Sequence, residues 1–301
     1  MTTNIAVFTR PSSLATLRGY VALTKPMIIV LLLVTTIPAM VVAEGGWPGT
    51  WLVLATLFGG TLSAGGANVI NQWYDRDIDA IMKRTRSRPI PAGLIEPRHA
   101  LAFGIGLGTV AFAFLWVTTT PAAAALSLAA LLFYVFIYTM WLKRRTTQNI
   151  VIGGAAGAFP PMVGWAAVTG DVTLSSVLMF AIVFMWTPPH FWALALKLKD
   201  DYAEAGVPML PVIAGPAATR RQIVIYSIVL AATSLLLAPA AGLWLVYLPA
   251  AVILGSIFIA ESLRLSREHA RVSPMRLYKY SLLYLALLFL AIGIDGALTM
   301  V

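Results

Sequence analysis

Long apolar stretches recur along the 301-residue chain, separated by short polar connectors. A membrane-spanning helix needs about 20 predominantly apolar residues. Windows of this kind cover residues 26–44, 51–71, 100–118, 122–142, 149–168, 175–195, 222–240, 243–262 and 278–298. The pattern predicts an all-α, polytopic integral membrane bundle of nine transmembrane helices, with an N-terminal segment (residues 1–25) and a single domain (residues 26–301).

The basic residues predict an orientation for this bundle. All 21 lysines and arginines lie before the first window or after the second, fourth, sixth and eighth windows. The other connectors and the C-terminal end contain none. Because basic residues are enriched in cytoplasmic segments beside membrane helices, we expect a cytoplasmic N-terminus, an external C-terminus and an odd number of spans.

Composition excludes a water-soluble enzyme, because 59% of the residues are hydrophobic and only 11% are charged. The chain has no cysteine, which excludes disulfides, zinc thiolates and iron–sulfur clusters. Its net charge of +9 is explained by topology and by attraction to anionic lipid. Membrane lipid is therefore an expected partner and nucleic acid is not. The run Lys143–Arg145 is assigned to this topological role.

Oxygen-bearing side chains gather where the second window ends. Asn71, Asp75 and Asp79 follow one another at intervals of four residues, which places them on one face of a continuing helix, whereas Asp77 points elsewhere. Mg²⁺ is held in proteins by carboxylates together with substrate phosphate oxygens. Like charges four residues apart also destabilise a helix that has no counter-ion. The spacing therefore predicts a magnesium site at this helix end.

A basic loop follows, with four lysines and arginines between residues 83 and 88, ahead of two prolines and a glycine. Arginine recognises phosphate or carboxylate oxygens with two parallel hydrogen bonds, so Arg84 and Arg88 are candidates for binding an anionic substrate. The alternative is a solvated helix end, in which Arg76 and Lys83 pair with the neighbouring acids.

His190 lies beside two consecutive prolines inside the sixth window. Proline removes a backbone donor and kinks a helix, and within a membrane the freed carbonyls must face protein or a polar cavity. An ionisable residue at this depth indicates function. The alternative is a neutral histidine that hydrogen-bonds to a neighbouring helix.

A second acidic segment leaves the sixth window. Asp201 follows Lys197 by one helical turn, and Asp200 and Glu204 form a further pair four residues apart. Four helices separate this exit from the first acidic segment, an interval that preserves orientation. We therefore expect both segments at the same membrane face, where they could hold metal ions on opposite sides of one diphosphate.

These two segments, residues 71–93 and 186–211, resemble the intramembrane aromatic prenyltransferases, and within that superfamily the enzymes that farnesylate haem B. The similarity rests on Asn71-x3-Asp75-x3-Asp79 and on the segment containing Asp201. Several superfamily members have two aspartates four residues apart in the second motif, whereas this chain has lysine at position 197. That departure leaves the ligands of a second metal ion open.

The resemblance implies transfer of a farnesyl group from farnesyl diphosphate to a vinyl group of haem B, giving haem O, with Mg²⁺ as the cofactor and haem as a substrate. It also implies a plasma (inner) membrane enzyme with a cytoplasmic active site and an unidentified haem-handling partner. The implied metal ligands are Asn71, Asp75, Asp79, Asp200 and Asp201. The implied substrate-binding residues are Asn68, Asn71, Lys83, Arg84, Arg88, His190 and Lys197. The implied catalytic residues are Asp75, Asp79, Arg84, Arg88 and His190.

Two alternatives stay open at this point. One is a prenyltransferase for another aromatic acceptor, although a small acceptor would not need both the arginine-rich loop and the histidine. The other is a transporter, in which kinked helices and polar groups serve a translocation path. Ionisable residues concentrated at one membrane face argue against a transporter.

Overall fold

The structure is a computed structural model that describes residues 12–267 and 273–298, and every element within these ranges is a helix. The helices are α1 (Ser13–Thr24), α2 (Pro26–Glu44), α3 (Thr50–Tyr74), α4 (Arg76–Ile81), α5 (Pro97–Thr118), α6 (Pro121–Leu132), the π-helix η1 (Phe133–Leu142), α7 (Asn149–Gly153), α8 (Ala155–Thr169), α9 (Leu174–Lys197), α10 (Lys199–Glu204), α11 (Leu210–Ile213), α12 (Gly215–Ala241), α13 (Tyr247–Ser266) and α14 (Pro274–Leu298).

The all-α prediction is confirmed. In the described part of the chain, eight helices are long and apolar enough to cross a membrane, and a ninth span results if α1 and α2, bent by 44° at their junction, count as one. Each predicted window coincides with a helix or with two consecutive helices, except that α13 begins at Tyr247, four residues into its window. The structure adds α1, which lies in the segment expected to precede the first span.

Local sequence explains where several of these helices begin and end. Pro97 and Pro121 occupy the first positions of α5 and α6, where the missing backbone N–H has no helical partner to lose. Gly170 and Gly242 follow α8 and α12 with φ of 73° and 69°. This left-handed conformation closes a helix and is accessible to glycine without steric cost.

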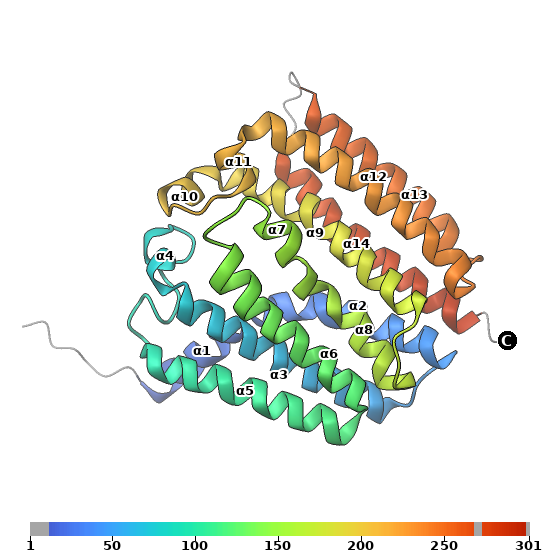
Figure 1. The fold of residues 1–301 in the computed structure, drawn as a ribbon, viewed down its shortest axis with the longest axis horizontal. Coiled ribbons are helices and arrows are strands. Elements are labelled where there is room, and N and C mark those ends of the chain that lie inside the picture. The colour runs from blue at the N-terminus through green and yellow to red at the C-terminus, as the bar shows by residue number, and fades with distance from the viewer. Residues whose placement is uncertain (1–11, 268–272, 299–301) are drawn as a thin grey trace, which may run out of the picture.

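The long helices pack in an oblique bundle (Figure 1). In its centre α2 contacts α8 and α14, and α9 contacts α8 and α14; α3, α5 and α6 flank this centre on one side and α12 and α13 on the other. The short helices α4, α10 and α11 collect at one end, on the left in Figure 1. The exits of α3 and α9 therefore lie at the same end of the bundle, as the topology predicted.

The contact between α3 and α5 depends on glycine. A Cβ atom on Gly66 would lie 2.8 Å from the carbonyl oxygen of Gly104 and 3.0 Å from the backbone nitrogen of Gly108. Small residues at four-residue spacing let two membrane helices approach closely, because no side chain separates their backbones. This packing holds α3, and hence its acidic end, in place.

We predict that Gly66→Leu destabilises the bundle by about 1–3 kcal/mol, the usual cost of overpacking a core. The measurement is the thermal unfolding midpoint in detergent. The matched control is Gly106→Leu on α5, because a Cβ atom there meets nothing within 4 Å. Equal midpoints for the two variants would contradict the role given to Gly66.

Candidate active site

The end of α3 presents three oxygen-bearing side chains on one buried face. Asp75 separates α3 from α4, but the N–H of Asp79 donates to the carbonyl of Asp75 at 2.8 Å, so the helical path is nearly continuous. Asn71, Asp75 and Asp79 are only 3%, 0% and 2% exposed. The amide of Asn71 donates to the Asp75 carboxylate at 2.8 Å. The predicted common face is therefore present.

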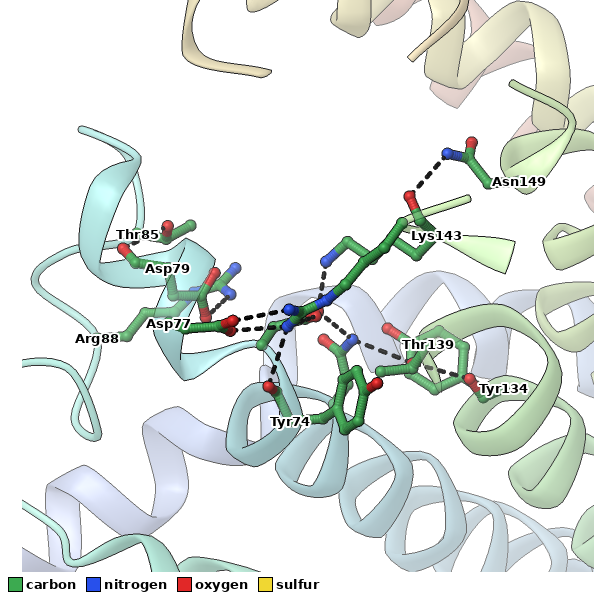
Figure 2. Close-up of polar contacts among 12 residues, drawn as sticks. Tyr74, Asp77, Asp79, Thr85, Arg88, Tyr134, Thr139, Lys143 and Asn149 are labelled. Atoms are coloured by element: carbon green, nitrogen blue, oxygen red, sulfur yellow. Dashed lines mark hydrogen bonds and ion pairs between the residues drawn. The ribbon is translucent and has the colours of Figure 1, made fainter. Parts of the chain in front are cut away.

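Basic side chains from other segments neutralise the two carboxylates. The Lys143 ammonium donates to Asp75 Oδ2, and an Arg144 guanidinium nitrogen lies 3.4 Å from Asp75 Oδ1. The Arg88 guanidinium contacts Asp79 Oδ2 at 2.6 Å. Figure 2 shows Arg88 against Asp79, with Lys143 reaching the site from another part of the bundle. These contacts supply the counter-ions that stacked carboxylates need.

Arg76 does not supply the expected counter-charge. Its guanidinium donates to the carbonyl of Trp73 at 2.7 Å and lies over the Trp73 ring, 5.5 Å from the centroid. Lys83 is exposed on the loop that follows α4. The alternative of a solvated end is therefore wrong about these partners: the acids are buried, and their ionic partners come from residues 88, 143 and 144.

Arg144 also binds Asp77, the aspartate that points away from the buried face. Two of its nitrogens contact the Asp77 carboxylate oxygens at 2.7 Å each. This hydrogen bonding is the main cause that lowers the pKa of Asp77 to about 2 and raises that of Arg144. The guanidinium lies 4.9 Å from the centroid of the Tyr74 ring. Lys143 and Arg144 thus bind the acidic segment directly, beyond the topological role that the sequence suggested.

The π-helix η1 brings a second set of side chains to this rim. Thr139 accepts a hydrogen bond from the Asn71 amide at 3.2 Å and donates to the carbonyl of Tyr134 at 2.8 Å. π-helical turns are rare and are frequently found at functional sites. Here the π-helix ends at Leu142, and Lys143, the next residue, reaches Asp75.

Lys25, at the junction of α1 and α2, is a rim residue that sequence reasoning missed. Its ammonium nitrogen lies 3.1 Å from Asn71 Oδ1, and its φ is 54°. A non-glycine residue in this region is strained, and such residues cluster at functional sites. Two hydrogen bonds fix the junction to α3: Asn68 donates to the carbonyl of Thr24 at 3.1 Å, and Gln72 donates to that of Leu23 at 2.6 Å.

An apolar cluster joins the two acidic exits. Ile78 and Met82, from the α4 side, pack with Tyr202, Val207 and Met209, which follow α9. Burial raises the pKa of the Tyr202 hydroxyl, and the positive charge of the Arg84 guanidinium opposes that rise. The predicted convergence of the two exits is therefore found, and packing of apolar side chains holds the two segments together.

A cavity of about 380 Å³ extends from this rim into the bundle. Six of the predicted site residues line it: Asn68, Asn71, Asp79, Arg84, Arg88 and His190. Five further ionisable residues on its wall were not predicted: Lys25, Tyr134, Tyr138, Lys143 and Tyr202. Most of the other residues on the wall have apolar or small side chains. The cavity thus joins a charged rim to a hydrophobic interior.

The other predicted residues lie outside this wall. Asp75 is fully buried behind its ion pairs. Lys83, Lys197 and Asp200 are exposed, and Asp201 is partly buried. The structure therefore places Asn71 and Asp79 of the first motif on the cavity wall, Asp75 behind it, and the polar side chains of the second motif beside the cavity.

His190 is held by α14. Its Nδ1 lies 2.7 Å from the hydroxyl of Ser281, and its ring stacks on Trp186 and Tyr278 with centroids 4.1 and 4.7 Å away. The Ser281 hydroxyl donates its one hydrogen to the carbonyl of Tyr278 at 2.6 Å. It must then accept from His190 Nδ1–H, which leaves a lone pair on Nε2. Both proposed properties of His190, a bond to a neighbouring helix and a place in the cavity, are present.

The donor set at the rim suits a hard divalent cation. Amide and carboxylate oxygens of Asn71, Asp75 and Asp79 share one face, and Mg²⁺ prefers such ligands together with substrate phosphate oxygens. Within residues 12–267 and 273–298, no three histidine or acidic side chains are close enough to hold a metal ion alone. In addition to Asp75 and Asp79, a bound ion would therefore need the amide oxygen of Asn71 and oxygens of the substrate.

Comparison with known proteins identifies the fold family. The sequence pattern of the UbiA prenyltransferase family matches residues 32–291, most of the chain. The chain belongs to the UbiA prenyltransferase family. With its long apolar helices it is an integral membrane protein, and the transporter alternative is not supported.

Several relatives are similar over almost their whole length. The protoheme IX farnesyltransferase of Clavibacter sepedonicus is 55% identical over 284 residues, covering 93% of each chain. The protein of the same name from Nocardioides sp. is 52% identical over 299 residues, covering 97% of this chain and 95% of its own. These relatives confirm the resemblance to haem-farnesylating enzymes.

Solved structures confirm the fold. A digeranylgeranylglyceryl phosphate synthase superposes with a TM-score of 0.77 at 19% identity, covering 94% of this chain and 99% of its own. A UbiA homolog from Archaeoglobus fulgidus, bound to GPP and Mg²⁺, gives a TM-score of 0.67 at 17% identity, with coverage of 93% and 99%.

We predict a pH-dependent contribution of Asp77 to stability. Because its pKa in the folded protein is lowered from 3.8 to about 2, the ionised carboxylate stabilises the fold above pH 4, and this stabilisation disappears as the pH falls toward 2. Thermal midpoints should show Asp77→Asn less stable than the parent at pH 6, with the difference closing by pH 2. The side chain is 61% exposed, so the effect is small.

The control is the same substitution in an Arg144→Gln background, where Asp77→Asn should change little at any pH. A difference between parent and Asp77→Asn that is equal at pH 6 and pH 2 would contradict the Arg144–Asp77 pairing as its source.

Proposed function

We propose that this protein transfers the farnesyl group of farnesyl diphosphate to a vinyl group of haem B and so makes haem O. The bond between the farnesyl C1 and the diphosphate oxygen breaks, and a bond forms from C1 to the vinyl carbon. Water adds a hydroxyl group to the neighbouring carbon and loses a proton, and diphosphate leaves. The observation that carries the proposal is the single cavity that joins a cationic rim to an apolar interior.

Charge at the rim suits departure of the diphosphate. Lys25, Arg84, Arg88 and Lys143 line the cavity there, and cationic groups fixed before the reaction stabilise developing negative charge without reorganisation. Relatives that are 50% to 55% identical and are named protoheme IX farnesyltransferase support this reading of the rim. Lys83 and Lys197, exposed at the same end, are proposed to attract the anionic substrates.

Magnesium is proposed as the cofactor, with Asn71, Asp75 and Asp79 as ligands. When bound it would supply positive charge that stabilises the leaving diphosphate. The UbiA homolog of Archaeoglobus fulgidus bound to GPP and Mg²⁺ supports this choice. Asp200 and Asp201 are proposed for a second ion, because Tyr202, the next residue, lines the same cavity as Arg84 and Arg88.

The interior is proposed to shield the prenyl cation from water. Its wall is largely apolar, and exclusion of water prevents hydrolysis of a reactive intermediate. Arg84 and Arg88 suit the haem propionates, because a guanidinium binds a carboxylate with two parallel hydrogen bonds. The Nε2 lone pair of His190 suits either the haem iron or a proton that moves during hydration.

The proposed location is the plasma membrane, with the N-terminus and the active site on the cytoplasmic side. The segregation of lysine and arginine into alternate connectors supports this orientation. The product stays in the membrane because of its farnesyl chain, so a membrane protein that accepts a prenylated haem is the proposed partner. Residues 26–301 are proposed as one catalytic domain.

We predict that purified protein makes haem O from haem B and farnesyl diphosphate only when Mg²⁺ is present. Asp79→Asn should reduce kcat about 100-fold or more, since a metal-held charge contributes several kcal/mol to the transition state. The measurement is product formation followed by mass spectrometry. Asp77→Asn is the matched control and should keep most of the activity. Full turnover after complete chelation would overturn the role of the metal.

We predict that His190→Ala changes the absorption spectrum of ferric haem B bound to the protein if Nε2 ligates iron. Ser281→Ala should reproduce part of this change, because it removes the acceptor that fixes Nδ1–H, whereas Ser281→Thr should keep the parent spectrum. Identical spectra for parent and His190→Ala would exclude axial ligation and leave proton transfer as the remaining proposed role.

A further inference from the structure

The four glycines on the cavity wall are of two kinds. A Cβ atom on Gly153 would lie 2.2 Å from the Tyr138 ring, and one on Gly154 would lie 2.8 Å from the Thr187 side chain. Close packing therefore explains both of these glycines. A Cβ atom on Gly60 or Gly157 would meet nothing within 4 Å. At these two positions the protein leaves open space that a side chain could fill.

Gly60 differs in the same way from its neighbour in sequence. A Cβ atom on Gly59 would lie 2.5 Å from the Leu115 side chain, so the contact between α3 and α5 requires glycine there. Gly60 has no such contact and lines the cavity instead. Glycine inside a helix costs about 1 kcal/mol relative to alanine. Since no packing contact offsets that cost, the free volume itself is what Gly60 provides.

The position of Gly60 on α3 shows where along the cavity this free space lies. Gly60 precedes Asn71 by eleven residues on α3, which corresponds to about 16 Å along the helix axis. Ala64 and Ala67 line the cavity between them, and Thr56 lines it one turn deeper. Gly157, in α8, follows Asn149, the first residue of α7, by only eight residues. It therefore lies nearer the rim than Gly60 does. Gly60 therefore borders the deep part of the chamber, far from the charged groups.

We infer that Gly60 determines the length of prenyl chain that the cavity accepts. The inference rests on the proposed function, in which the diphosphate is held beside Asn71 and the isoprenoid runs along α3 into the interior. The terminal isoprene unit of a farnesyl chain then occupies the space beside Gly60, and a geranyl chain, one unit shorter, ends above it. A bulky side chain at position 60 removes the space for the last unit only.

The test compares the parent protein with Gly60→Ala and Gly60→Leu, each supplied with haem B, Mg²⁺ and either farnesyl or geranyl diphosphate. We compare the two donors by the ratio of kcat/KM for farnesyl diphosphate to kcat/KM for geranyl diphosphate. For Gly60→Leu we expect this ratio to fall at least tenfold. The reason is that a hydrophobic pocket distinguishes substrates that differ by one methylene group by about 10- to 200-fold. Gly60→Ala should give a smaller shift in the same direction. Retained turnover with geranyl diphosphate shows that the variant is folded.

Gly106→Leu is the matched control, because this exposed glycine on α5 also has open space at its Cβ position but does not line the cavity. It should leave the ratio unchanged. A parallel loss of both activities in Gly60→Ala and Gly60→Leu, or an unchanged ratio, would overturn the assignment of Gly60. A parent protein that prenylates haem B with neither donor would instead overturn the proposed function.

Discussion

Two carboxylates, those of Asp75 and Asp79, are almost wholly removed from solvent at the end of α3, and a buried charge must be compensated nearby. The compensation comes from separate parts of the chain, Lys143 after η1 and Arg88 in the loop after α4. The carboxylates therefore determine which segments meet at this end of the bundle. The same charges that stabilise the acids also form the cationic rim. Binding of the proposed diphosphate and Mg²⁺ would therefore exchange ionic partners within one charge-balanced cluster.

Glycine and alanine decide how this rim connects with the interior. Gly66 lets α3 lie directly on α5, and Gly153 gives space to the ring of Tyr138 on η1. These contacts fix the walls, whereas the small residues on the cavity side of α3 leave the chamber open. A single helix thus packs tightly on one face and borders the cavity on another, and its last turn carries Asn71, one of the proposed metal ligands. The depth of the void and the position of the charged rim are set by the same rigid element.

Local spacing in the sequence predicted what one helix determines by itself. The apolar windows located the long helices, and four-residue intervals placed Asn71, Asp75 and Asp79 on one face. The contacts that the sequence did not reveal join distant segments: Lys143 meets Asp75 across 68 residues, and His190 meets Ser281 across 91 residues. The spacing of apolar and polar residues along the sequence does not indicate which distant residues pair in this way. Lys25 was missed for another reason, because its unusual backbone conformation is visible only in three dimensions.

The last helix shows that the site extends beyond the two sequence motifs. Ser281 accepts a hydrogen bond from Trp186 through its carbonyl and meets His190 through its hydroxyl, so α14 fixes both aromatic residues of α9. Near the same end, Glu261 of α13 contacts Arg276 of α14 at 2.7 Å. A shift of α14 would therefore move the imidazole relative to the rim, even though α14 carries neither motif. The first acidic motif lies at one end of the chamber, and α14, through polar contacts, orients the histidine on the chamber wall.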